Sequence, residues 1–129
     1  MPKDADLYFR LTSAGNLTAD EAGSTHILDL GPGGVRNAVA WIRVPSITST
    51  DTLDAKLQFD DSSSIASPDH ETEFPQITAA GYYTIAFSTT RRYVGLDLDI
   101  TDVGGGGFSA GAVEAGITLF DYPAQGARP

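Results

Sequence analysis

RRYVGLDLDIT, residues Arg91–Thr101, alternates between apolar and other side chains from Val94 onward. Successive side chains of a β-strand face opposite sides of the sheet, so this spacing predicts one buried face and one solvent face. The expected buried set is Val94, Leu96, Leu98 and Ile100, and the expected solvent set is Gly95, Asp97, Asp99 and Thr101. Helical spacing would scatter the aspartates among the apolar residues, so the stretch is typical of a half-buried strand.

Segments of the same kind recur along the chain and are separated by turn residues. We expect further strands at Leu7–Leu11, Thr25–Leu30, Ala38–Val44, Leu53–Phe59, Tyr82–Ser88 and Ala112–Phe120, and a broken edge strand at Phe74–Ile77. Pro75 confines the last of these to an edge because proline has no N–H to donate. The polar stretch Asp60–Glu73 is expected to be a long surface loop.

About eight strands can close a two-sheet jelly roll, so the sequence predicts an all-β fold, a jelly-roll β-sandwich of about eight antiparallel strands. An immunoglobulin-like sandwich also fits the strand count, although no Cys–Trp–Cys pattern supports it. The length of 129 residues suits one core. We place the jelly-roll domain at residues 24–121, after an N-terminal strand and extended arm at 1–23 and before an extended tail at 122–129.

Charge and cysteine content exclude several classes of partner and site. The formal net charge of -9 disfavours binding to nucleic acid or to an anionic membrane. The absence of cysteine removes disulfides, thiol catalysis and cysteine-based metal sites. The first residues lack the apolar core of a signal peptide, so we expect a protein made in the cytoplasm.

Few residues suit catalysis. His26 and His70 are the only histidines, and no G-x-S-x-G motif is present. His26 shares a strand face with Leu28, which indicates a packed structural histidine. We therefore expect that the protein is not an enzyme and that it has no catalytic residue and no cofactor. The acidic stretch Asp60–Glu73 leaves two interpretations open, a solvated loop or a calcium site.

Aromatic and arginine side chains are the candidate interface residues. Ala38–Val44 is apolar on both faces, so Trp41 is either covered by a second layer or presented to another chain. Arg91 and Arg92 could bind a partner carboxylate or the acidic loops of the protein itself, and the sequence leaves both open. The full set of candidates is Trp41, Arg43, Tyr82, Arg91, Arg92 and Tyr93.

The order and spacing of five segments resemble the Bbp16-like capsid cement (decoration) proteins of tailed bacteriophages. These segments are STHILDLG (Ser24–Gly31), AVAWIRV (Ala38–Val44), AKLQFDDSSSIASP (Ala55–Pro68), RRYVGLDLDIT (Arg91–Thr101) and FSAGAVEAGITLFD (Phe108–Asp121). The resemblance implies a jelly-roll protein of the virion that binds the outer surface of the head, typically as a trimer. It further implies contacts that bridge major capsid protein subunits, and no catalytic residue.

Two functions follow as hypotheses. In the first, the protein staples capsid subunits, and Met1–Ala22 and Tyr122–Pro129 are candidate arms that order on a neighbour. In the second, it is a jelly-roll carbohydrate- or receptor-binding module of a phage or bacterial surface. In that case Trp41, Tyr82 and Tyr93 would stack on sugars.

Overall fold

The computed structural model describes residues 4–9, 16–23, 26–32, 35–65 and 67–120. Its elements are β1 (Asp4–Tyr8), β2 (Ile27–Asp29), β3 (Arg36–Val44), β4 (Thr52–Asp60), β5 (His70–Glu73), β6 (Gly81–Thr89), β7 (Tyr93–Thr101) and β8 (Glu114–Phe120). All of them are strands, so the predicted all-β class is confirmed. Within these residues, no helix has the length and apolar character that crossing a membrane requires.

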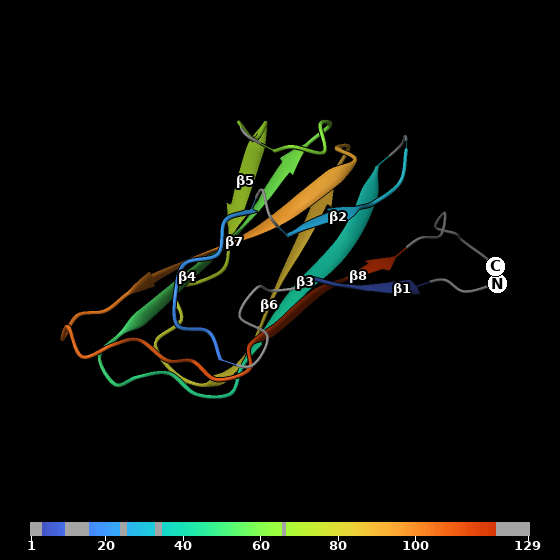
Figure 1. Cartoon of the computed structure of the whole chain (residues 1–129). Helices are drawn as coiled ribbons and strands as arrows, with labels where there is room; N and C mark the ends of the chain where they lie inside the picture. The colour runs from blue at the N-terminus through green and yellow to red at the C-terminus, as the bar shows by residue number, and fades with distance from the viewer. Residues whose placement is uncertain (1–3, 10–15, 24–25, 33–34, 66, 121–129) are drawn as a thin grey trace.

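The strands form two antiparallel four-stranded sheets that face each other (Figure 1). Sheet A has the order β1-β8-β3-β6, and sheet B has the order β2-β7-β4-β5. The first strand pairs with the last, and the pairing continues inward along the chain. The pairs are β1 with β8, β2 with β7, β3 with β6 and β4 with β5. This is a long hairpin wrapped into two sheets, which is the jelly-roll topology. The pairing confirms the predicted jelly roll and removes the immunoglobulin-like alternative.

The core lies between the two sheets and is filled by side chains that alternate inward from both. In β7, Val94, Leu96 and Leu98 are at most 1% exposed, as the alternation predicts, and Ile100 is half-buried at the end of the strand. Sheet A contributes the alternate residues of β3 and β8 in the same way. Each such apolar side chain stabilises the fold by roughly 1.5–3 kcal/mol. Burial on this pattern is the main force that holds the two layers together.

The edge of sheet B differs from the sequence prediction. Residues 70–73, expected to be loop, form β5, which pairs with β4 from Lys56 to Phe59. The edge strand expected at Phe74–Ile77 is wrong, because Ile77 makes only one isolated bridge, to Leu53. Every side chain of β5 is polar, so no alternation marks it, and the strand depends on the backbone ladder that β4 offers.

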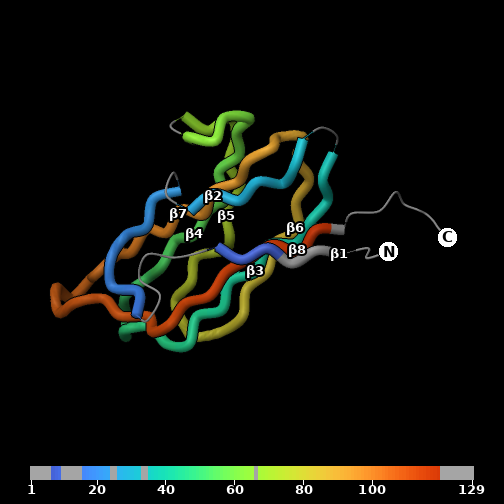
Figure 2. Tube along the Cα trace, turned by 45° about the vertical axis from the view of Figure 1, so that its right-hand side comes forward, coloured from blue at the N-terminus to red at the C-terminus, as the bar shows by residue number. Residues whose placement is uncertain are grey.

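Two described parts of the N-terminal region, residues 4–9 and 16–23, lie against the sandwich. The first strand runs from Asp4 to Tyr8 and pairs with β8, whereas Leu7–Leu11 was expected. The segment 16–23 lies beside β7 (Figure 2), where the N–H and C=O groups of Glu21 both bond to the backbone of Leu98, at 2.9 and 2.7 Å. Leu17 is fully buried. The rest of the proposed arm at 1–23 and the tail at 122–129 lie outside the described residues.

Candidate functional site

The outer face of sheet A carries a row of aromatic side chains. Tyr8 comes from β1, Trp41 from β3 and Tyr82 from β6, and we call these three the aromatic face. Tyr8 is 61% and Tyr82 63% exposed, while Trp41 lies partly buried between them. Trp41 points outward because its neighbours Ala40 and Ile42 point into the core. Of the two alternatives for Trp41, the structure selects presentation on an open sheet face.

The three rings contact one another across the strands. The Tyr8 ring meets the Trp41 indole edge-on, with centroids 5.5 Å apart and planes at 77°. The Tyr82 ring is nearly parallel to the indole, with centroids 6.1 Å apart and planes at 17°. Together with Thr118 the rings line a shallow hollow of about 280 Å³. Such an arrangement offers apolar surface of fixed geometry to a ligand or a protein partner.

Gly116 makes room for this row. It lies on β8, directly opposite Tyr8 on one side and Trp41 on the other. A Cβ atom at this position would stand 2.7 Å from Cζ2 of the indole and 2.5 Å from the carbonyl oxygen of Leu7. The absence of a side chain therefore lets the indole cross β8 and reach Tyr8.

Arg43 lies at the border of the aromatic face. It is opposite Tyr82 in the sheet, and its Nε and Nη2 donate to one oxygen of Glu114, at 3.1 and 2.9 Å. Both side chains are about half exposed, so the pair contributes only about 0–1 kcal/mol. Three of the predicted site residues, Trp41, Arg43 and Tyr82, are thus brought together on one surface.

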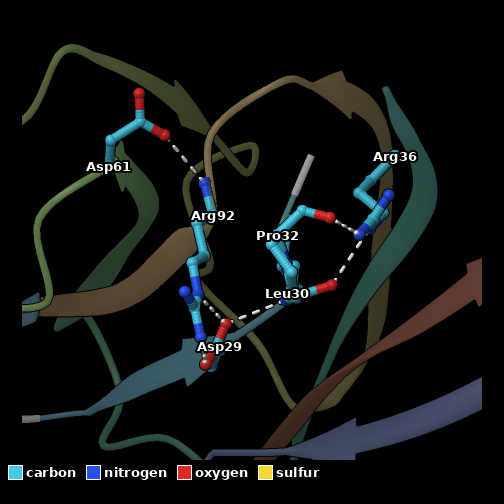
Figure 3. A network of polar contacts seen from close by, with 7 residues as sticks. Asp29, Leu30, Pro32, Arg36, Asp61 and Arg92 are labelled. Atoms are coloured by element: carbon cyan, nitrogen blue, oxygen red, sulfur yellow. Dashed lines mark hydrogen bonds and ion pairs between the residues drawn. The ribbon is translucent and has the colours of Figure 1, made fainter. Parts of the chain in front are cut away.

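The other three candidates lie elsewhere. Tyr93 is the first residue of β7 in sheet B, and Arg91 and Arg92 come directly before it. Arg92 donates from Nε and Nη2 to the two carboxylate oxygens of Asp29 (Figure 3). Both hydrogen bonds are 2.8 Å long. The Arg92 guanidinium lies 5.2 Å from the centroid of the Tyr93 ring. Tyr93 is therefore not part of the aromatic surface with which it was grouped.

Arg91 is held by the acidic loop that follows β4. Its Nη1 donates to Asp61 at 3.0 Å, and its Nε lies 3.3 Å from a carboxylate oxygen of Asp69. The hydrogen bond from Arg91 lowers the pKa of Asp61, and the backbone N–H of Arg92 lowers it further. Both arginines therefore pair with carboxylates of the protein itself, which is the second of the two alternatives that the sequence left open.

The acidic residues are also engaged with other groups of the fold. Glu71 accepts a hydrogen bond from Gln58 at 2.8 Å and lies 3.4 Å from the Lys56 ammonium. In the part of the chain that the structure describes, no group of three or more His, Cys, Asp or Glu side chains is arranged to hold a metal ion.

His26 is a packed residue, as expected. It is 5% exposed and its Nε2 contacts Oε1 of Glu21, which is 4% exposed. The contact joins the start of the β2 region to the segment that runs beside β7. The pair therefore contributes to the packing of the N-terminal segment, and it lies on the opposite sheet from the aromatic face.

Asp99 and Asp29 are a matched pair for a pH experiment. Asp99 lies directly opposite Asp54, and partial desolvation together with the charges of Asp20 and Asp97 raises its pKa. A raised pKa in the folded state means that the ionised carboxylate is less favourable there than in the unfolded chain. Stability is therefore lost as the pH rises above the ordinary pKa of 3.8. Asp99→Asn is therefore expected to raise the melting temperature at pH 7 by about 1–3 °C. The gain should shrink as the pH falls below the ordinary value near 3.8, where the carboxyl group takes up a proton in the folded and the unfolded chain alike.

Asp29→Asn is the control of opposite sign. Its pKa is lowered to about 2, first by the hydrogen bond from Arg92 and then by the Gly31 N–H. A lowered pKa stabilises the folded protein at pH values above the ordinary pKa of 3.8. This stabilisation is lost as the pH falls toward 2. This variant should therefore melt below the native protein at pH 7. Melting curves that move in the same direction for both variants would contradict the assignment of the two carboxylates.

Comparisons with known proteins assign no family to this chain. No model of a protein family matches the sequence. No curated protein sequence matches it either. Among solved structures, the chain is similar to a carbohydrate-binding module, CBM6cm-2 of lichenase 5A from Cellvibrio mixtus, in complex with cellotriose. The two share 10% identity at a TM-score of 0.31, over 92% of this chain and 87% of that one. A score this low does not bear on function.

Proposed function

We propose that this protein is a capsid decoration (cement) protein of a tailed bacteriophage, and that it docks on the outer surface of the head through its aromatic face. The observation that carries the proposal is the row of Tyr8, Trp41 and Tyr82 on an open sheet surface. The resemblance of five sequence segments to cement proteins supports the class, and the jelly-roll topology agrees with the fold that the resemblance implies.

The composition of this surface suits a protein partner. Tyrosine, tryptophan and arginine are enriched at the centres of protein interfaces, where a few residues carry most of the binding energy. Each aromatic side chain can bury about 150–250 Å². Repeated copies on one shell need only modest affinity at each contact, and the net charge of -9 would keep decorated particles apart.

Trp41→Ala tests the proposal. The indole lies on the outer face, so the variant should keep the native circular dichroism spectrum, but it should bind undecorated heads at least about 10-fold more weakly. Binding is measured by co-sedimentation of purified protein with heads of the phage that encodes it. Val103→Ser is the matched control, because Val103 is 63% exposed in a loop outside the aromatic face.

Two outcomes would count against the proposal. If the native protein does not bind the heads of its own phage, the decoration role is removed. If the native protein and the Trp41→Ala and Tyr82→Ala variants bind equally well, docking takes place on another surface.

The hollow between the rings favours a second candidate, a carbohydrate-binding module. Aromatic platforms stack on sugar rings, and about 280 Å³ is room for part of a sugar chain. Electrophoresis in gels that contain soluble polysaccharide distinguishes the two functions. Retardation of the native protein but not of Trp41→Ala, together with no binding to heads, would support the carbohydrate function.

A further inference from the structure

The free edges of the two sheets differ in their content of charged residues. Among the described residues, four strands have only one neighbour: β1 and β6 in sheet A, and β2 and β5 in sheet B. The sequences of three of these edge strands contain acidic residues, namely Asp4 and Asp6 in β1, Asp29 in β2, and Glu71 and Glu73 in β5. The fourth, β6, reads GYYTIAFST and contains no charged residue and no proline. Proteins commonly block exposed edges with charge or proline, and β6 has neither.

The β6 edge is also long and incompletely closed. All nine residues of β6 pair with β3, and no strand of the described residues pairs with its other side. The inward side chains Tyr83, Ile85 and Phe87 are only half-buried, whereas the inward apolar residues of β3, from Ala38 to Val44, are at most 2% exposed. The core therefore remains partly open to solvent along this edge, which exposes apolar surface beside an unused backbone ladder.

We propose that a second copy of this chain pairs with β6 in antiparallel fashion, about a two-fold axis at Ile85. The sequence of the strand is self-complementary in that register. Tyr83 of each copy lies opposite Phe87 of the other, and Thr84 lies opposite Ala86. The first pair extends the core with facing aromatic rings, and the second is small and uncharged on the outer face.

The charge of the protein favours self-association at the β6 edge rather than at the three other sheet edges. Two chains of net charge -9 repel over most of their surface, so self-association requires a contact that is free of carboxylates. The nine residues of β6 form such a contact, about 30 Å long. Pairing across a two-fold axis uses the same patch on both copies and closes at two, so this inference replaces the trimer that the resemblance implied. It would join the two A sheets into one continuous sheet with both aromatic faces on the same side.

Charge pairs at positions 84 and 86 test both the contact and its register. Thr84 and Ala86 are exposed, so lysine or glutamate at these positions should leave the fold intact, which circular dichroism verifies. The native protein should be a dimer by sedimentation equilibrium between about 1 µM and about 200 µM. Thr84→Lys with Ala86→Lys places like charges opposite each other twice and should weaken dimerisation at least about 10-fold.

Two further proteins fix the register. Thr84→Lys with Ala86→Glu places opposite charges across the axis and should remain dimeric. The double-lysine protein mixed with Thr84→Glu and Ala86→Glu should form a heterodimer. Val103→Lys adds a positive charge in an exposed loop and should dimerise like the native protein.

Three results would overturn the inference. They are a native monomer over the whole concentration range, a native mass of three chains, and a double-lysine protein that dimerises as well as the native one. The inference does not rest on the decoration role, because the assay contains no heads. A native monomer would leave head binding open, and a failure to bind heads would leave the dimer intact.

Discussion

Leu96→Asp is expected to abolish folding. Leu96 is fully buried in β7 and lies opposite Leu57 of β4, near the middle of sheet B. The change removes roughly 1.5–3 kcal/mol of apolar burial and also places an unpaired carboxylate in the core, which costs several kcal/mol more. The sum is comparable with the whole stability of a typical domain, about 5–15 kcal/mol. Expression in soluble form and the circular dichroism spectrum are the measurements.

Asp97→Asn is the matched control for that experiment. Asp97 is the next residue of the same strand, but it points to the outer face, where one carboxylate oxygen accepts a hydrogen bond from the Gly23 N–H at 3.1 Å. An amide oxygen can accept the same bond, so the variant should be soluble and should melt near the native temperature. Comparable loss of soluble protein from both changes would contradict the assigned facing of β7.

Gly95→Ala is expected to lower the free energy of unfolding by about 1–3 kcal/mol. A Cβ atom on Gly95 would stand 2.2 Å from the carbonyl oxygen of Gly23, and a backbone group cannot rotate away as a side chain can. The segment 16–23 must then shift from β7, which strains the two backbone bonds between Glu21 and Leu98. Denaturant unfolding measures the loss, and proteolysis within 16–23 should become faster.

Gly104→Ala is the control for the glycine. No heavy atom lies within 4 Å of the place where its Cβ would be, so the midpoint of unfolding should stay close to the native value. If both alanine variants unfold at the same denaturant concentration, the close approach of Gly95 to Gly23 does not limit the native packing.

The strands with an apolar face could be located from the sequence alone. Alternation in Leu53–Phe59 and in Val94–Ile100 is a local property, because neighbouring side chains of a strand face opposite ways whatever the strand pairs with. β5 could not be located in this way. Its four residues are all polar, and they form a strand because the backbone of β4 lies beside them.

The candidate site was found in part. Trp41, Arg43 and Tyr82 share a surface because β3 and β6 pair in a register that places Arg43 opposite Tyr82. Tyr8 was missed as a site residue, although its place between Leu7 and Phe9 already indicated an outward side chain. The contact of Tyr8 with Trp41 depends on the space that Gly116 leaves for the indole. Gly116 lies in a strand far away in the sequence, and no local sequence pattern indicates that it leaves this space.

By itself, the sequence determined which residues face the core and that the protein is built of strands, because side-chain alternation requires only neighbouring residues. The tertiary structure decided which strands pair, and therefore which outward residues meet. Trp41 meets Tyr8 across β8, and Arg91 meets Asp61 rather than the aromatic face. These contacts join residues that are dozens of positions apart. Only the jelly-roll pairing of the two halves of the chain brings them together.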